Sequence, residues 1–409
     1  MINPRIYFFF SLFVFVPLLS GCWDSLDVEK RASVLGIAID KVDPAEAKKE
    51  ENQISHLKEE GESSNEQYIR LTAQIAVPGR VPLNALAGGG EGGAQESVWV
   101  LSVVGHSLDD AILNLQQEVA DPLFFGHLRI IVFSEKVASE GVQKFNDYLR
   151  RQPQVRRTAW MAVSKENAKK YMEIAPELEP IPALYLSSMV EDAVGAGKLP
   201  YDSIGIFWIA LSNLGQDGFL PYLTIGEKHN VRVEGVGYFT GDKMKGTIEP
   251  IKIGPLMTIL GEEQGGYGLM TNMPGTEDKV LVRATKRRSN IKTAIKNEEK
   301  PEIRIKIRYD VRIEENESPT YSLDSPEIIR KIEDRYSEEV KDAYEQFIQD
   351  MQKEGSDIFG FGEYIRAKQP TYWEKKVKTQ EQWRSIYTSQ LDVQVEVQTR
   401  ITQIGMKEQ

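Results

Sequence analysis

The only cysteine of the 409-residue sequence, Cys22, stands where its thiol could take part in one specific reaction. It follows Leu19, Ser20 and Gly21, and this order of residues fits the lipobox of bacterial lipoproteins. In that reaction the thiol receives a diacylglyceryl group, and cleavage then makes the cysteine the new N-terminus. A single cysteine also excludes an intrachain disulfide and a CxxC metal site. The sequence therefore predicts a covalent lipid on Cys22.

The residues before Cys22 have the pattern of a cleaved signal peptide. Arg5 supplies a positive charge, and an apolar run of 14 residues extends from position 6 to position 19. A transmembrane helix needs about 20 apolar residues, whereas the apolar region of a signal peptide needs roughly 7–15. We therefore expect residues 1–21 to be removed. The lipid should then hold the rest of the chain on the outer face of the cell membrane. Two acyl chains make a stable anchor, because each buried methylene contributes about 0.8 kcal/mol.

No other set of side chains has the spacing of a catalytic or metal site. The four histidines lie at positions 56, 106, 127 and 229. None of them is in HxxxH or HExxH spacing, so the sequence argues for no metal site. Gly88, Gly90 and Gly93 formally match GxGxxG, but a strand-like segment follows them where a dinucleotide site needs a helix. We expect a flexible loop at 88–93, no bound cofactor, no catalytic residues and no enzymatic activity.

The charge balance narrows the kinds of partner. Fifty lysine and arginine residues stand against 61 aspartate and glutamate residues, and the net charge of −11 argues against binding to nucleic acid. Seven cations nevertheless collect on what we expect to be the solvent-exposed faces of late strands: Lys286, Arg287, Arg288, Arg304, Lys306, Arg308 and Arg312. This patch could attract anionic lipid headgroups, and a solvated strand face is the competing interpretation.

The first half of the chain has the pattern of an α/β domain, which we place at residues 22–200. Apolar, β-branched segments at 33–40 and 68–77 predict strands, and the acidic insert at 44–66 is expected to be disordered. Helices are then predicted from Ser107, over 135–151 and over 164–174, and strands over 97–104, 128–133 and 158–163. This alternation favours crossovers onto a sheet.

Three prolines near position 180 end that pattern, and a small β-rich middle domain is expected at 201–285. It begins with an apolar stretch at 204–211. Farther along, two strand patterns over 231–239 and 246–251 predict a hairpin.

The last third of the chain, 286–409, has the clearest periodicity. Apolar and polar residues alternate over 303–313 and again over 391–401, which predicts two strands with one buried face each. Between them a long helix is expected after Ser325, with one apolar stripe: Ile328, Ile332, Tyr336, Val340, Tyr344, Phe347 and Met351. We therefore expect an α+β domain in which a long helix packs on a largely antiparallel sheet.

Several short stretches carry a resemblance to a known family. They are Gly21-Cys22-Trp23-Asp24, ASVLGIAIDK at 32–41, GHLR at 126–129, RRQPQVR at 150–156, DIFGFG at 357–362, KQP at 368–370 with Trp373, and the terminal strand that ends at Gly405. In these stretches the chain resembles the spore germination receptor C-subunit family, the Ger(x)C lipoproteins of spore-forming Gram-positive bacteria.

The resemblance implies a non-enzymatic lipoprotein subunit of a nutrient germinant receptor, needed for receptor assembly and signalling. It implies two integral membrane subunits as partners, on the outer face of the inner spore membrane. A solute-binding lipoprotein of a transporter is the alternative, although it requires two similar lobes and the halves of this chain differ. The arginines at 150, 151 and 156, on a connector between a helix and a strand, are the first candidates for a contact surface.

Overall fold

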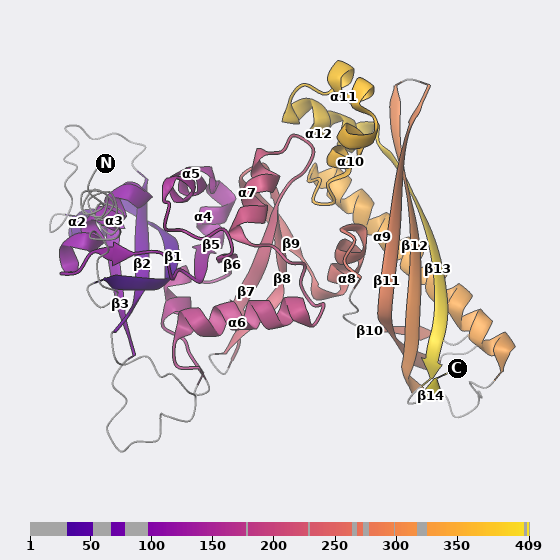
Figure 1. Ribbon diagram of the computed structural model, residues 1–409, viewed down its shortest axis with the longest axis horizontal. Coiled ribbons are helices and arrows are strands. Elements are labelled where there is room, and N and C mark those ends of the chain that lie inside the picture. The colour runs from indigo at the N-terminus through magenta and orange to yellow at the C-terminus, as the bar shows by residue number, and fades with distance from the viewer. Residues whose placement is uncertain are drawn as a thin grey trace, which may run out of the picture.

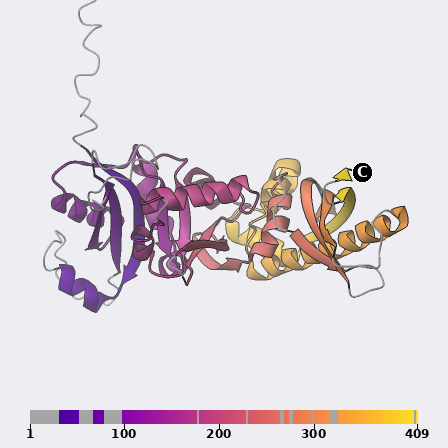
Figure 2. The ribbon, with the colours of Figure 1, turned by 90° about the horizontal axis from the view of Figure 1, so that it is seen from below.

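The computed structural model describes residues 31–51, 67–77, 97–176, 179–227, 230–263, 268–272, 278–297, 299–316, 325–404 and 407–408. Strands in this part of the chain form two sheets, one of nine strands and one of five. The sheets lie one after the other along the long axis of the molecule (Figure 1), and the view from below again places them at opposite ends (Figure 2). The predicted multidomain architecture of an α/β part followed by an α+β part is confirmed.

The first sheet is that of the predicted α/β domain. Its strands are β1 (Ala32–Val42), β2 (Tyr68–Ala76), β3 (Val98–Gly105), β4 (Leu123–Phe124), β5 (Ile130–Ser134), β6 (Trp160–Ser164), β7 (Phe219–Ile225), β8 (Val231–Thr240) and β9 (Lys243–Ile248). Their order in space is β3-β2-β1-β5-β6-β7-β8-β9, and β4 pairs with the start of β1. The central pairs β1-β5, β5-β6 and β6-β7 are parallel, and antiparallel pairs flank them. Because central parallel strands are covered on both faces, β5 and β6 are buried along their whole length.

Helices cover both faces of this sheet. They are α3 (Leu108–Glu118), α4 (Glu135–Glu140), α5 (Gln143–Arg151), α6 (Pro182–Gly195), α7 (Ile204–Ser212) and the 3-10 helix η3 (Ala168–Met172). One face, with Ile131 and Phe133 of β5, shares a core with α3, α4, α5 and α7. The other face, with Ile130 and Val132, shares a core with α6 and η3. Alternation along β5 therefore sends successive side chains into two cores, with α6 on the opposite side of the sheet from α5 and α7 (Figure 1).

Two predicted helices are shorter than expected. The pattern over 135–151 is divided into α4 and α5 at Gly141, whose φ of 126° lies outside the range that other residues readily adopt. A Cβ atom on Gly141 would also lie 2.4 Å from Oδ2 of Asp242 in the turn between β8 and β9. The pattern over 164–174 forms only η3. The turn at Asp242, which packs on Gly141 and accepts the N–H group of Val142, therefore lies where the predicted single helix divides, although the side-chain periodicity is continuous.

The acidic insert at 44–66 begins with a helix, α2 (Pro44–Glu51), so the prediction of disorder is wrong for these residues. Arg70 of β2 holds this helix, because its Nη2 atom lies 2.9 Å from Glu46 and 2.7 Å from Glu50. The rest of the insert, 52–66, lies outside the described residues, as does the glycine loop at 88–93.

The expected middle domain at 201–285 does not form a sheet of its own. β7, β8 and β9 extend the first sheet, whereas β10 (Gly268–Asn272) and β11 (Lys279–Lys296) belong to the second. The predicted hairpin is present as β8 and β9. Turn and strand patterns therefore located β8 and β9, whereas β7 and β10 were not predicted, and the boundary between the two sheets lies after β9.

The second sheet and its helices match the predicted α+β domain. Besides β10 and β11 its elements are β12 (Lys300–Asn316), α9 (Pro326–Glu354), α10 (Phe361–Lys368), α11 (Pro370–Lys376), α12 (Gln380–Ser389), β13 (Asp392–Ile404) and β14 (Lys407–Glu408). The predicted stripe of α9 is buried at Ile332, Tyr336, Val340, Tyr344, Phe347 and Met351. The sheet is antiparallel except that β12 and β13 are parallel, because α9 to α12 carry the chain back before β13 begins.

One joint connects the second sheet to the first. α8 (Pro250–Ile259) packs against β8, β11 and α9. Beside it, the N–H group of Asp217 donates to the carbonyl of Asp357 at 2.9 Å, and that of Glu363 donates to the carbonyl of Gly215 at 3.2 Å. A Cβ atom on Gly362 would lie 2.4 Å from Cα of Gly215, so the two backbones meet where no side chain fits.

Two buried carboxylates hold this joint. Asp217 accepts the N–H groups of Asp357 at 2.9 Å and of Gly241 at 2.7 Å. Asp357 accepts three hydrogen bonds, from the backbone N–H groups of Phe361 at 3.0 Å and Gly362 at 2.9 Å and from the indole N–H of Trp383 at 2.9 Å. Burial raises the pKa of Asp357 to about 7, and the neighbouring Asp217 adds to the rise.

The raised pKa of Asp357 predicts a pH-dependent contribution to stability. An unfolded aspartate has a pKa of about 3.9, so between pH 4 and 7 the folded state binds the extra proton, and the stability from this group falls as the pH rises. We expect Asp357→Asn to lower the free energy of unfolding by about 1–3 kcal/mol at pH 4, because its amide NH₂ faces N–H donors. The deficit should shrink toward pH 7, as measured by urea unfolding between pH 4 and 8.

Asp342→Asn, at an exposed position of α9, is the matched control and should change stability by less than about 0.5 kcal/mol at every pH. A deficit of Asp357→Asn that is constant across the pH range would contradict the assignment of this carboxyl as the titrating group.

Candidate functional site

Ligands usually bind at the carboxyl ends of the parallel strands in open α/β sheets. At these ends of the first sheet, two carboxylates accept hydrogen bonds from other groups of the protein. Asp40 at the end of β1 accepts the N–H groups of Ala168 and Lys169 at 2.7 and 2.9 Å and so caps η3. Nearby, the hydroxyl of Tyr222 donates to Glu135. Burial raises the pKa of Asp40, and these backbone hydrogen bonds oppose the rise. The carboxylates of Asp40 and Glu135 at this edge therefore already have partners within the protein.

A groove opens at the opposite edge, at the amino ends of the same strands. We call it the amino-edge groove, and its volume is about 800 Å³. Its walls are mainly apolar, with Leu35, Ala76, Val77, Leu128, Trp160 and Leu184. Its polar lining includes Arg31, His127, Arg129, Arg156, Glu191 and Tyr201. The groove therefore combines an apolar interior with an excess of guanidinium groups.

The guanidinium groups of the groove differ in what holds them. Arg31 lies over the ring of Phe124, 4.9 Å from its centroid. Arg129 and Arg156 are exposed, and within the described chain their side chains have no hydrogen bond or ion pair. Glu191 is the only carboxylate among the described lining residues. Two cations at the groove are thus available to an anionic group.

A second surface feature lies on α7, within the apolar stretch at 204–211. Ile206 and Ile209 are 38% and 58% exposed, and we call these two residues the α7 stripe. Arg150 flanks it: its Nη1 atom donates to Oγ of Ser212 at 3.2 Å, and its guanidinium lies 6.0 Å from the ring centroid of Trp208. The predicted arginine connector is therefore divided, with Arg150 beside the α7 stripe and Arg156 in the groove.

The described histidines do not come together. The ring of His106 packs against Tyr68 at 4.6 Å between centroids, and that of His127 packs edge-on against Phe124 at 5.3 Å. The other two histidines lie outside the described residues, and so does Cys22, whose predicted lipid stays a prediction. In the ranges that the structure describes, no three potential metal ligands gather in one place.

The predicted basic patch is wrong for one residue. Arg287 is only 2% exposed, and it donates to the carbonyls of Gly254 at 3.1 Å and Glu262 at 3.2 Å. A bulge between Ala284 and Lys286 shifts the alternation of β11, so that position 287 faces the core. Burial lowers the pKa of Arg287. This residue therefore fastens α8 to the second sheet.

Carboxylates compensate most of the remaining patch. The ion pairs are Lys286–Glu263, Arg304–Glu302, Lys306–Glu396 and Arg312–Glu314. Arg288 and Arg308 are exposed and stand opposite each other on β11 and β12. The interpretation as a solvated strand face therefore accounts for most of these cations.

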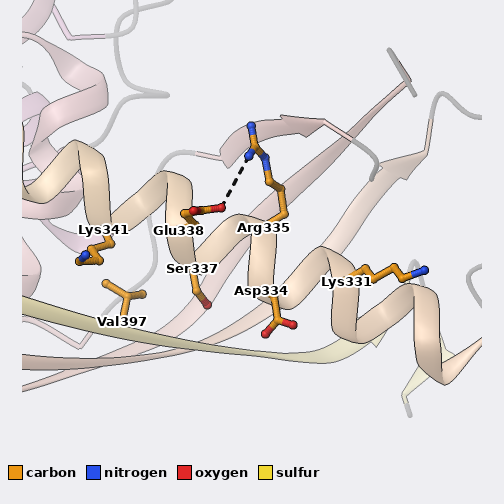
Figure 3. Close-up of a pocket in the computed structure, with 7 residues that line it drawn as sticks. All are labelled: Lys331, Asp334, Arg335, Ser337, Glu338, Lys341 and Val397. Atoms are coloured by element: carbon orange, nitrogen blue, oxygen red, sulfur yellow. Dashed lines mark ion pairs between the residues drawn. The ribbon is translucent and has the colours of Figure 1, made fainter. Parts of the chain in front are cut away.

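A shallow depression of about 530 Å³ lies where α9 passes over β13 (Figure 3). Its described lining is almost entirely charged or polar, with Val397 of β13 as the exception. Arg335 pairs with Glu338 at 3.6 Å, and Asp334 and Ser337 turn toward the strands. Charges that compensate one another along a helix are typical of a solvated helix face, so we assign no site here.

Comparison with known proteins accounts for nearly the whole chain. Residues 24–225 match the family model of the spore germination protein N-terminal domain, and residues 234–405 match the model of the spore germination B3/GerAC-like C-terminal region. The chain belongs to the Ger(x)C family of spore germination proteins. No helix in the described ranges of this Ger(x)C protein is long and apolar enough to cross a membrane.

Individual relatives match this Ger(x)C protein from end to end. It is 26% identical to spore germination protein KC of Bacillus subtilis (strain 168), over 96% of this chain and 94% of that protein. It is 25% identical to spore germination protein GerQC of Bacillus cereus, over 82% of this chain and 90% of that protein. The crystal structure of the GerBC protein superposes with a TM-score of 0.56 at 19% identity, over 85% of this chain and 99% of that one, and so has the same fold.

The stretches that carried the resemblance occupy structurally distinct places in the Ger(x)C protein. GHLR at 126–129 lines the amino-edge groove, and the DIFGFG stretch at 357–362 forms half of the joint. Sequence reasoning identified both stretches, but it found neither the groove nor the joint. The groove is assembled from six separated segments of chain, and no local pattern shows that they meet.

The burial of Arg287 leads to a prediction about stability. We expect Arg287→Met to lower the free energy of unfolding by about 1–3 kcal/mol, because the carbonyls of Gly254 and Glu262 lose their donors inside the protein. Its exposed neighbour gives the matched control, since Arg288→Met should change the value by less than about 0.5 kcal/mol. Chemical unfolding measures both, and equal effects would contradict the burial of Arg287.

Proposed function

We propose that this Ger(x)C protein is a lipid-tethered subunit of a spore nutrient germinant receptor, needed for receptor assembly and signalling. The observation that carries the proposal is the match of two spore germination family models to nearly the whole chain. The relatives are named spore germination proteins, and the names of four of them end in C, B3 or A3, as expected for subunits in a set. Its partners in the proposal are the two integral membrane subunits, and its place is the outer face of the spore inner membrane. It acts as a binding subunit and not as an enzyme.

The sequence around Cys22 supports the tether. A 14-residue apolar run is too short to span a bilayer, and it leads directly into the lipobox. A diacylglyceryl group on the only cysteine would supply the membrane attachment for residues 22–409.

The α7 stripe supports assembly through a surface. Exposed apolar side chains beside an arginine are the usual composition of a protein–protein contact, where a desolvated centre supplies most of the affinity. Ile209 is 58% exposed on a helix that has no charged residue of its own. We infer that another subunit of the membrane receptor covers this stripe, since such a contact would remove its apolar side chains from water.

The alternative of a solute-binding lipoprotein finds less support. Such proteins close two similar lobes around a solute by a hinge. Here the two sheets differ in strand number and order. Buried carboxylates and paired backbones also join them.

The tether predicts the outcome of replacing Cys22. We expect Cys22→Ala to remove the protein from the membrane fraction or to reduce its retention, because the variant has no attachment point for the lipid. Cell fractionation followed by a high-salt wash measures retention, since salt screens a purely electrostatic association. Mass spectrometry of the wild-type N-terminal peptide should show the added diacylglyceryl mass on Cys22. Equal retention of the variant after the wash would argue against the lipid tether.

The α7 stripe predicts an effect on assembly. We expect Ile209→Asp to reduce co-purification with the two membrane subunits at least tenfold, because burying an unpaired carboxylate in an interface costs free energy. Leu113→Asp on α3 is the matched control, since Leu113 is also about half exposed, at 48%, on a helix of the same domain.

Affinity purification from spore membranes, with germination rate as a second measurement, tests this assignment. Both variants should keep the thermal stability of the wild-type protein. Normal co-purification and germination of Ile209→Asp would show that assembly uses another surface.

A further inference from the structure

The amino-edge groove has the composition of a lipid site. We propose that it binds one anionic phospholipid of the membrane that carries the tether, with the phosphate at Arg129 and Arg156 and part of an acyl chain along the apolar wall. The proposal rests on the proposed function only for the nearness of the membrane, since the groove itself is a property of the described residues.

The interior of the groove is suited to hydrocarbon. Leu35 is 9% exposed, Leu128 is 3% exposed and Trp160 is 8% exposed, and together they form a fixed apolar wall. Its volume of about 800 Å³ lies within the range of sites that enclose a small ligand. An acyl chain placed there would leave water without the loss of any hydrogen bond.

The charged side chains suit a phosphate. Arginine binds phosphate oxygens through two parallel N–H groups, and it does so best when no other anion competes for it. Arg129 and Arg156 meet this condition within the described chain, although the protein as a whole has a net charge of −11. An amino-acid nutrient suits the groove less well, because after pairing its ammonium with Glu191 and its carboxylate with one arginine it would leave the other arginine and most of the apolar wall without a partner.

The chain also places the groove near a bilayer. Arg31 lines the groove and is nine residues after Cys22. At no more than about 3.6 Å per residue, the groove lies within about 32 Å of the lipidated residue. The other exposed arginine pair, Arg288 and Arg308, belongs to the second sheet at the other end of the molecule (Figure 1).

The test uses the mature chain, residues 22–409, with Cys22→Ala so that no covalent lipid is present. Binding is measured to vesicles of phosphatidylcholine with and without phosphatidylglycerol, and by calorimetry to a short-chain phosphatidylglycerol below its micelle concentration and to glycerol phosphate. We expect binding to the anionic vesicles and to the short-chain lipid, and at least tenfold weaker binding to pure phosphatidylcholine and to glycerol phosphate.

Variants separate the groove from general surface charge. We expect Arg129→Glu combined with Arg156→Glu to weaken binding of the short-chain lipid more than about tenfold. Arg288→Glu combined with Arg308→Glu makes the same change of charge on the second sheet and should alter binding less than twofold. Ala76→Trp fills the groove without a change of charge and should also weaken binding. Thermal unfolding shows whether each variant is folded. If Ala76→Trp is not folded, the arginine variants alone decide the result.

Three results would overturn the proposal. Equal losses in the two arginine pairs would mean a general electrostatic attraction, and glycerol phosphate that binds as tightly as the lipid would mean a free phosphate site. Loss of co-purification with the membrane subunits at unchanged lipid binding would mean that the groove holds a protein. The lipid-binding measurements use a chain without the lipid of Cys22, so a failure there is distinct from a failure of the proposed tether.

Discussion

Two buried carboxylates, Asp217 and Asp357, determine how the two sheets are placed relative to each other. Between them they accept five N–H groups, from Asp357 itself before α10, the turn before β9, two residues at the start of α10 and the indole of Trp383. An interior N–H group without an acceptor costs about 1–3 kcal/mol, and separating the sheets would remove the acceptors of the N–H groups of Asp217, Asp357 and Glu363. The same carboxylates are themselves costly to bury, as the raised pKa of Asp357 records. Their energetic value therefore lies in specifying one arrangement of the two sheets.

In the first sheet, the edge suited to a ligand is the one at the amino ends of the parallel strands, opposite to the edge that open α/β sheets usually use. At the carboxyl ends of its parallel strands, Asp40 and Glu135 bond to groups of the protein itself. At the amino ends, chain segments that enter the strands leave a groove in which Arg129 and Arg156 have no ion-pair partner among the described residues. Since Arg31 lies at this edge, the region nearest the proposed anchor is also the most suited to an external ligand.

The accuracy of the sequence predictions depended on how local each structural cause was. The stripe of α9 and the strands β12 and β13 were predicted correctly, because the spacing of their apolar residues is visible within one continuous segment of sequence. Arg287 was misplaced because a single-residue bulge inverts the faces of β11, and bulges leave little trace in composition. The groove and the joint were not predictable, because Asp217 and Asp357 are 140 residues apart and only the folded chain brings them together.

The long strands of the second sheet have a mechanical consequence. β11 has 18 residues, which at about 3.4 Å per residue makes it about 60 Å long. α8 of the joint contacts β11 near its middle, through Arg287, and the strand runs across the long axis of the molecule on both sides of this contact (Figure 1). The second sheet is therefore a lever whose fulcrum is the joint. A tilt of the second sheet by about 5° about this contact would move each end of β11, about 30 Å away, by about 3 Å, which is enough to make or break a hydrogen bond.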